Sequence, residues 1–188
     1  MKQFEIPLGY KYLKTIDLLK DKKAAIIINV LSIIITIILI VIGAIISFYI
    51  VDEFQVGLKD VLLFIGAIVI YIILHEAVHG IWFRIFSGRW GNFGYKGIYF
   101  YAGSKAFYTK REYIIIGLAP IILFGIIFLL LNIFLPPKYF IFFYLLQVLN
   151  ISGGAGDLYV AYLMKKLPRG AVFRDHGIRI EIYVPEVG

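Results

Sequence analysis

The sequence predicts an all-α polytopic membrane protein with four transmembrane helices, small cytoplasmic β-hairpin elements and both termini in the cytoplasm. Hydrophobic residues make up 61% of the 188 residues, whereas a soluble domain is roughly 45–50% apolar. They are concentrated in four long runs, and the basic residues alternate between the segments that separate these runs. The chain has no cysteine, so any metal must be bound by His, Asp or Glu.

Each of the four runs is long enough to cross a bilayer, which takes about 20 apolar residues as a helix. The first and third contain no charged residue, and the second and fourth contain one acid each, Glu76 and Asp157. The first run is too long for a removable signal peptide. We therefore expect one membrane domain over residues 1–188, with transmembrane helices at about 24–50, 61–86, 112–135 and 139–166.

Basic residues indicate the orientation. The 19 Lys and Arg residues number six in 1–23, one in 51–60, six in 84–112, one in 136–138 and five in 165–188. By the positive-inside rule, both termini, the loop 87–111 and the tail 167–188 are cytoplasmic. The net charge of +7 then serves orientation and contact with lipid headgroups. We expect the lipid bilayer, and not nucleic acid, as its partner.

Two cytoplasmic segments carry hairpin signals. Residues 88–110 alternate Gly with aromatic residues and contain a turn signal at Ala102-Gly103-Ser104. We expect Ile98–Tyr101 to pair with Ala106–Thr109 across this turn. A second hairpin is predicted over Ala171–Pro185, around Asp175-His176-Gly177.

The strongest chemical signal lies in the second run, within YIILHEAVHGIWF at residues 71–83. His75 and His79 are four residues apart, so a helix places both rings on one face, one turn apart. With Glu76 they form H-E-x-x-H, in which two His bind zinc and the Glu is the general base. A carboxylate in a membrane helix costs at least about 2.5–3.5 kcal/mol. A structural role alone does not explain that cost, so the motif favours a metal site.

A catalytic zinc usually has three protein ligands. The third ligand should lie at about the same depth in the membrane as the two histidines. His79 and His75 lie about 7.5 and 13.5 Å from the cytoplasmic end of their helix, at 1.5 Å per residue. Asp157 lies about 12 Å from the cytoplasmic end of the fourth helix by the same count. We therefore predict His75, His79 and Asp157 as zinc ligands. Glu112 and His176 are weaker candidates, because both are expected at or beyond the membrane surface.

Small and polar residues lead into Asp157. The stretch Ser152-Gly153-Gly154-Ala155-Gly156 is compatible with close helix packing or with a kink beside the metal. Asn150 could bind substrate or bond to a neighbouring helix. Pro120 removes one backbone bond from the third helix and is expected to kink it, but carries no chemistry.

Residues 71–83 together with 150–158 resemble the intramembrane zinc metalloproteases of the site-2 protease type. Those enzymes carry H-E-x-x-H on one membrane helix and an Asp ligand on a later one, and they have strand-like segments after the first motif. Their later motif has Asn and Pro leading into Asp-Gly, whereas here Asn150 leads to Asp157-Leu158 with no Pro. The chain is more similar to small prokaryotic zincin-peptidase membrane proteins of a domain of unknown function. The resemblance implies a multi-pass protein of a prokaryotic cell membrane.

The predicted function is zinc-dependent hydrolysis of peptide bonds in membrane protein or peptide substrates, within or at the edge of the membrane. Glu76 is the catalytic base, and Asn150, Ile98 and Tyr99 are candidate substrate-binding residues, since an edge strand at Ile98–Tyr101 could receive an extended substrate. Two other classes remain open. One is a metal-ion transporter with the same three ligands, and the other is a non-catalytic zinc-binding membrane scaffold.

Overall fold

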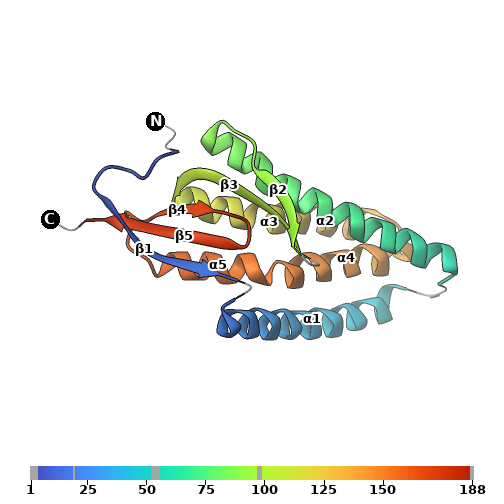
Figure 1. Cartoon of the computed structure of the whole chain (residues 1–188). Helices are drawn as coiled ribbons and strands as arrows, with labels where there is room; N and C mark the ends of the chain where they lie inside the picture. The colour runs from blue at the N-terminus through green and yellow to red at the C-terminus, as the bar shows by residue number, and fades with distance from the viewer. Residues whose placement is uncertain (1–3, 19, 52–55, 97–98, 187–188) are drawn as a thin grey trace.

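The computed structural model describes the chain except for residues 1–3, 19, 52–55, 97–98 and 187–188. Helical segments run side by side along the length of the molecule, and strands gather toward the end where both termini lie (Figure 1). The helices are α1 (Lys22–Ile50), α2 (Leu58–Ser87), α3 (Lys110–Phe134), a 3-10 turn η1 (Pro137–Tyr139), α4 (Phe140–Gly153) and α5 (Ala155–Lys165). The strands are β1 (Tyr10–Asp17), β2 (Asn92–Lys96), β3 (Tyr99–Thr109), β4 (Val172–Asp175) and β5 (Arg179–Pro185).

Among the described residues, four helical segments are long and apolar enough to cross a membrane: α1, α2, α3 and the segment from η1 through α5. In α1, none of the most apolar window is buried inside the protein. Soluble monomeric proteins rarely expose an apolar surface of this extent, and such surfaces are typical of contact with a membrane or another protein. The four helices are therefore consistent with a membrane protein.

The prediction of an all-α fold is wrong. About 64% of the residues that the structure describes are helical, and the described strands form one five-stranded antiparallel sheet in the order β1-β5-β4-β3-β2. The sequence predicted two local hairpins but no strand before the first helix. In the structure β1 pairs with β5 from the opposite end of the chain, and β3 pairs with β4. These long-range pairings join the hairpins into a sheet.

The predicted pairing of Ile98–Tyr101 with Ala106–Thr109 is also wrong. Strand β3 runs unbroken from Tyr99 to Thr109 and pairs with β2, so that Tyr99 lies opposite Lys96. Gly103 is not a turn residue. A Cβ at Gly103 would lie 2.8 Å from the backbone nitrogen of Gly177, so glycine permits a close approach of two backbones.

The second predicted hairpin, over Ala171–Pro185, is confirmed by the antiparallel pairing of β4 with β5. Gly177 takes the left-handed conformation, with φ of +85°, in the connection between them. The β1–β5 pairing further places both terminal strands on the same side of any membrane that the helices cross.

The β2–β3 hairpin extends along α2 rather than beyond its end (Figure 1). The Phe93 ring lies over Gly80, where a Cβ would clash with it. Gly80 is seven residues before the end of α2, so the hairpin reaches back about 10 Å along the helix at 1.5 Å per residue. Its exposed aromatic residues include Phe93, Tyr95 and Phe100.

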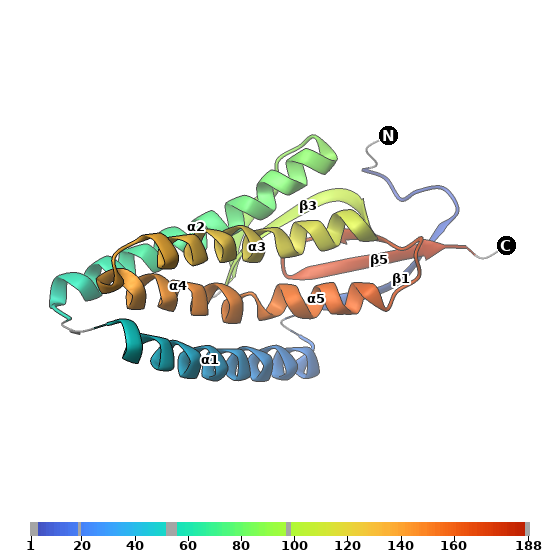
Figure 2. The same ribbon diagram turned by 180° about the vertical axis from the view of Figure 1, so that it is seen from behind.

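Two apolar cores stabilise this arrangement, and the candidate site lies between them. One packs the sheet against the ends of α2, α3 and α5, through side chains such as Phe83, Phe173 and Met164. The other packs α2, α3 and α4 together farther along the helices, around Tyr71 and Phe124. Figure 2 shows α3, α4 and α5 in front of α2 from the opposite side.

Candidate metal centre

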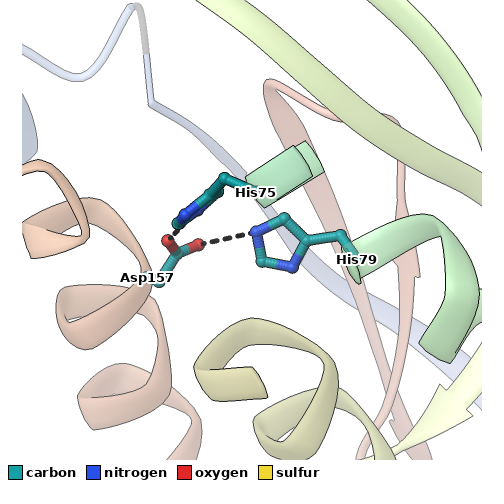
Figure 3. Close-up of side chains that lie close together, drawn as sticks. All are labelled: His75, His79 and Asp157. Atoms are coloured by element: carbon teal, nitrogen blue, oxygen red, sulfur yellow. Dashed lines mark ion pairs between the residues drawn. The ribbon is translucent and has the colours of Figure 1, made fainter. Parts of the chain in front are cut away.

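Three predicted ligands converge in the structure. His75 and His79 project from α2, one turn apart, and Asp157 projects from α5 toward both rings (Figure 3). The Asp157 carboxylate lies 3.5 Å from Nε2 of His75 and 3.7 Å from Nε2 of His79. One donor atom from each residue can be chosen so that all three lie within 4.8 Å of one another.

These distances fit zinc. Donors at about 2.0–2.1 Å from a tetrahedral zinc lie about 3.3 Å from one another, close to the two distances found here. Neutral imidazole nitrogens and a carboxylate oxygen are typical zinc ligands. Within the described part of the chain, this is the one group of three or more His, Asp or Glu residues with such spacing. The residues present therefore fit a zinc ion.

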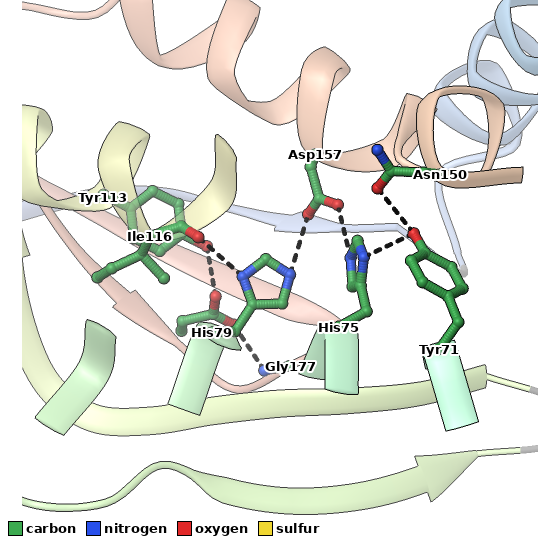
Figure 4. A network of polar contacts seen from close by, with 9 residues as sticks. Tyr71, His75, His79, Tyr113, Ile116, Asn150, Asp157 and Gly177 are labelled. Carbon is green, nitrogen blue, oxygen red and sulfur yellow. Dashed lines mark hydrogen bonds and ion pairs between the residues drawn. The ribbon is translucent and has the colours of Figure 1, made fainter. Parts of the chain in front are cut away.

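Hydrogen bonds orient both histidines for metal binding (Figure 4). Nδ1 of His79 donates to the backbone carbonyl of Ile116 at 2.8 Å. Nδ1 of His75 lies 3.0 Å from the Tyr71 hydroxyl, and that hydroxyl donates to Oδ1 of Asn150 at 3.0 Å. With each Nδ1 carrying the proton, each Nε2 has a free lone pair on the side of Asp157.

The fourth span is interrupted just before Asp157. α4 ends at Gly153 and α5 begins at Ala155, so Asp157 lies in the first turn of α5. Backbone N–H groups at a helix start favour a carboxylate there. Gly154 packs against Ile121 of α3, where a Cβ would come within 2.5 Å of that side chain. The glycine stretch thus combines an interruption with close packing, the two interpretations that the sequence left open.

Glu76 lies on the same cavity as the three ligands. The cavity has a volume of about 210 Å³ and is also lined by Phe100, Tyr101 and Ala102 of β3. Glu76 is half-buried, and the backbone of Ala102 lies against its carboxylate. A carboxylate beside a metal position and next to a backbone edge is placed to accept a proton from water.

The structure adds an acidic group that sequence reasoning did not assign to the site. Asp175, at the end of β4, lines the cavity and is almost fully buried. It accepts hydrogen bonds from the Tyr113 hydroxyl and the Gly177 amide, both at 2.6 Å. Burial raises the pKa of Asp175 from 3.8 to about 6, although both hydrogen bonds act to lower it. Asp175 appeared in the sequence only as a hairpin residue, so no local signal indicated this position.

The two weaker ligand candidates have other partners. Glu112 accepts hydrogen bonds from the backbone and hydroxyl of Thr109 and caps the start of α3. His176 lies 3.2 Å from a carboxylate oxygen of Glu181. Neither residue belongs to the group around Asp157.

The substrate-binding candidates remain predictions. Asn150 is fully buried, accepts from Tyr71 and donates to the Ile121 carbonyl at 3.0 Å, and it does not line the cavity. Tyr99 begins β3 and pairs with Lys96. Ile98 lies outside the described residues.

Comparison with known proteins identifies the family. Residues 67–172, more than half of the chain, match the family described as "Putative zincin peptidase", and the chain belongs to it. No curated protein and no solved structure gives a significant match. Membership indicates a zinc-dependent peptidase, and the matched region contains His75, Glu76, His79 and Asp157.

Proposed function

We propose that this protein is a zinc metalloendopeptidase, with His75, His79 and Asp157 as its metal ligands, and that it cleaves membrane protein or peptide substrates within or at the edge of the bilayer. The observation that carries the proposal is the convergence of the three donors on one cavity with Glu76. The ligands come from two of the segments that are apolar enough to span a membrane. A substrate would therefore meet the site at membrane level.

The number of ligands favours catalysis over a structural metal. A closed structural zinc site has four protein ligands, whereas a catalytic site has three and one open position. The described residues supply three, and a cavity adjoins them. An open position facing a cavity suits a peptidase better than a scaffold.

The chemistry assigned to this chain centres on Glu76. Zinc, when bound, would lower the pKa of a water molecule and polarise the carbonyl of the scissile bond. Glu76 accepts the proton from that water as the general base. It then returns the proton to the leaving amine, so that the carboxylate is regenerated. Phe100 and Ile116 give part of the cavity wall an apolar surface.

The edge of β3 offers a way to hold the substrate. Its first half, Tyr99–Gly103, pairs with β2 on one side, whereas β4 pairs with the second half, Ser104–Thr109. The first half therefore presents its other edge toward the cavity, which Phe100, Tyr101 and Ala102 line. An extended peptide can add to such an edge through backbone hydrogen bonds. A helical substrate must first unwind, because its carbonyl groups are bonded within the helix.

The test uses purified protein in liposomes with a single-span peptide that carries helix-weakening Gly and Asn residues in its centre. We expect cleavage inside the span that stops on zinc removal and returns when zinc is restored. The same central sequence as a short soluble peptide is the control, and it should be cleaved more slowly. Absence of cleavage together with zinc flux into the liposomes would instead support a transporter.

A further inference from the structure

We infer that Pro120 is a positioning residue for the metal ligand His79, an inference that rests on the zinc site of the proposed function. Pro120 lies inside α3, four residues after Ile116. In an α-helix the carbonyl of residue 116 would accept from the N–H of residue 120. Proline has no N–H, so Pro120 leaves the Ile116 carbonyl without its intrahelical donor.

Because the Ile116 carbonyl is buried, it needs another hydrogen-bond donor. Ile116 is 2% exposed and Pro120 is among the most deeply buried residues. A buried carbonyl without a partner is strongly disfavoured, the more so in a membrane. The donor is Nδ1 of His79, at 2.8 Å. His79 on α2 therefore supplies the hydrogen bond that Pro120 cannot donate within α3.

The position of His79 explains why a backbone carbonyl serves here. His75 is oriented by Tyr71, four residues earlier on the same face of α2. For His79 the residue four positions earlier is His75 itself, which is already a ligand. The acceptor for His79 comes instead from another helix, as the Ile116 carbonyl of α3. A carbonyl freed by proline is fixed by the helix backbone, so it holds the imidazole without requiring a polar side chain in the membrane.

The consequence for the metal is a fixed tautomer. With the proton on Nδ1, Nε2 of His79 keeps its lone pair and lies 3.7 Å from the Asp157 carboxylate. Loss of such a supporting hydrogen bond typically costs 10–100-fold in metal affinity. For Pro120→Ala we expect the lower end of this range, about a 10-fold loss of affinity. The Ile116 carbonyl oxygen has two lone pairs, so it could accept from His79 and from the restored N–H of residue 120 together.

The experiment compares Pro120→Ala with wild type and with Gly125→Ala, without any substrate. Both changes raise the helix propensity of α3, but only the first supplies an N–H to Ile116. A Cβ at Gly125 would make ordinary contacts, 3.6 Å or more away. We expect zinc affinity, measured by chelator competition, to fall about 10-fold in Pro120→Ala and to stay unchanged in Gly125→Ala. In metal-free samples, ¹⁵N NMR should show His79 protonated at Nδ1 in wild type and as a mixture of tautomers in Pro120→Ala.

Several results would overturn the inference. One is a His79 that is protonated at Nε2 in metal-free wild type. The others are an unchanged zinc affinity in Pro120→Ala, or a loss of zinc affinity in Gly125→Ala as large as that in Pro120→Ala. A lower affinity with an unchanged tautomer would also refute it, because the effect would not pass through the hydrogen bond. The wild-type tautomer decides the matter even if Pro120→Ala does not fold. Failure of the peptidase proposal would appear separately, as absence of cleavage by zinc-loaded wild type.

Discussion

Removing one hydroxyl, in Tyr71→Phe, should weaken zinc binding from a position that does not touch the metal. The Tyr71 hydroxyl contacts His75 and Asn150, each at 3.0 Å. Without it, Nδ1 of His75 loses its acceptor and the fully buried Oδ1 of Asn150 loses its donor. An unsatisfied buried polar group costs about 1–3 kcal/mol. Loss of a supporting partner lowers metal affinity about 10–100-fold, equivalent to about 1.4–2.8 kcal/mol.

The matched control is Tyr144→Phe. Tyr144 donates its hydroxyl to the Leu39 carbonyl of α1 at 2.7 Å, away from the metal ligands. Loss of this hydrogen bond should lower the free energy of unfolding by on the order of 0.6 kcal/mol, the average for interhelical hydrogen bonds in membranes. The zinc affinity should not change. Zinc affinity by chelator competition and thermal unfolding in detergent would be measured on both variants. Equal zinc affinities in Tyr71→Phe and Tyr144→Phe would refute the assignment of Tyr71 as support for His75.

Three further outcomes are expected. Zinc content should fall from about one ion per chain to near zero in Asp157→Ala, and full occupancy there would contradict its role as a ligand. Because the pKa of Asp175 is about 6 in the folded protein against 3.8 ordinarily, the folded state binds more protons in this interval, and the free energy of unfolding should fall as pH rises from about 4 to 6. Asp175→Asn should remove up to about 3 kcal/mol of this fall, seen as a smaller difference in Tm between pH 4 and 7, and an unaltered difference would contradict it. Tags at both termini should be reachable only from the cytoplasm, and labelling of the 51–60 loop from that side would contradict this orientation.

Local sequence patterns could predict the membrane-length helices and the residues of the candidate metal centre. A charge-free run of the required length forms a membrane helix wherever it lies, because every backbone group bonds within the segment. The spacing of His75 and His79 is also local, since it depends only on helix geometry. Depth counting then predicted Asp157 at a similar level, and the structure has its carboxylate beside both rings.

The rest depends on contacts between distant segments. The pairing of β1 with β5 joins the two ends of the chain, and no periodicity in either strand indicates its partner. Gly103 was ambiguous, because glycine serves both turns and close backbone approaches. Pro120 was predicted to kink α3 and nothing more, since the donor for the freed carbonyl lies on α2. Tyr71 and Asp175 gave no separate signal for the same reason.

The role of Glu76 as general base is tested by the zinc content and the cleavage rate of Glu76→Gln, both measured on one preparation. The carboxamide keeps the size of the side chain and leaves His75, His79 and Asp157 unchanged, but it cannot accept the proton. The matched control is Glu112→Gln, because Glu112 caps α3 outside the cavity. We expect both variants to keep about one zinc per chain, Glu112→Gln to cleave like wild type, and Glu76→Gln to be slower by about 10²–10⁴-fold. Cleavage at the wild-type rate by Glu76→Gln with its zinc in place would show that Glu76 is not the general base.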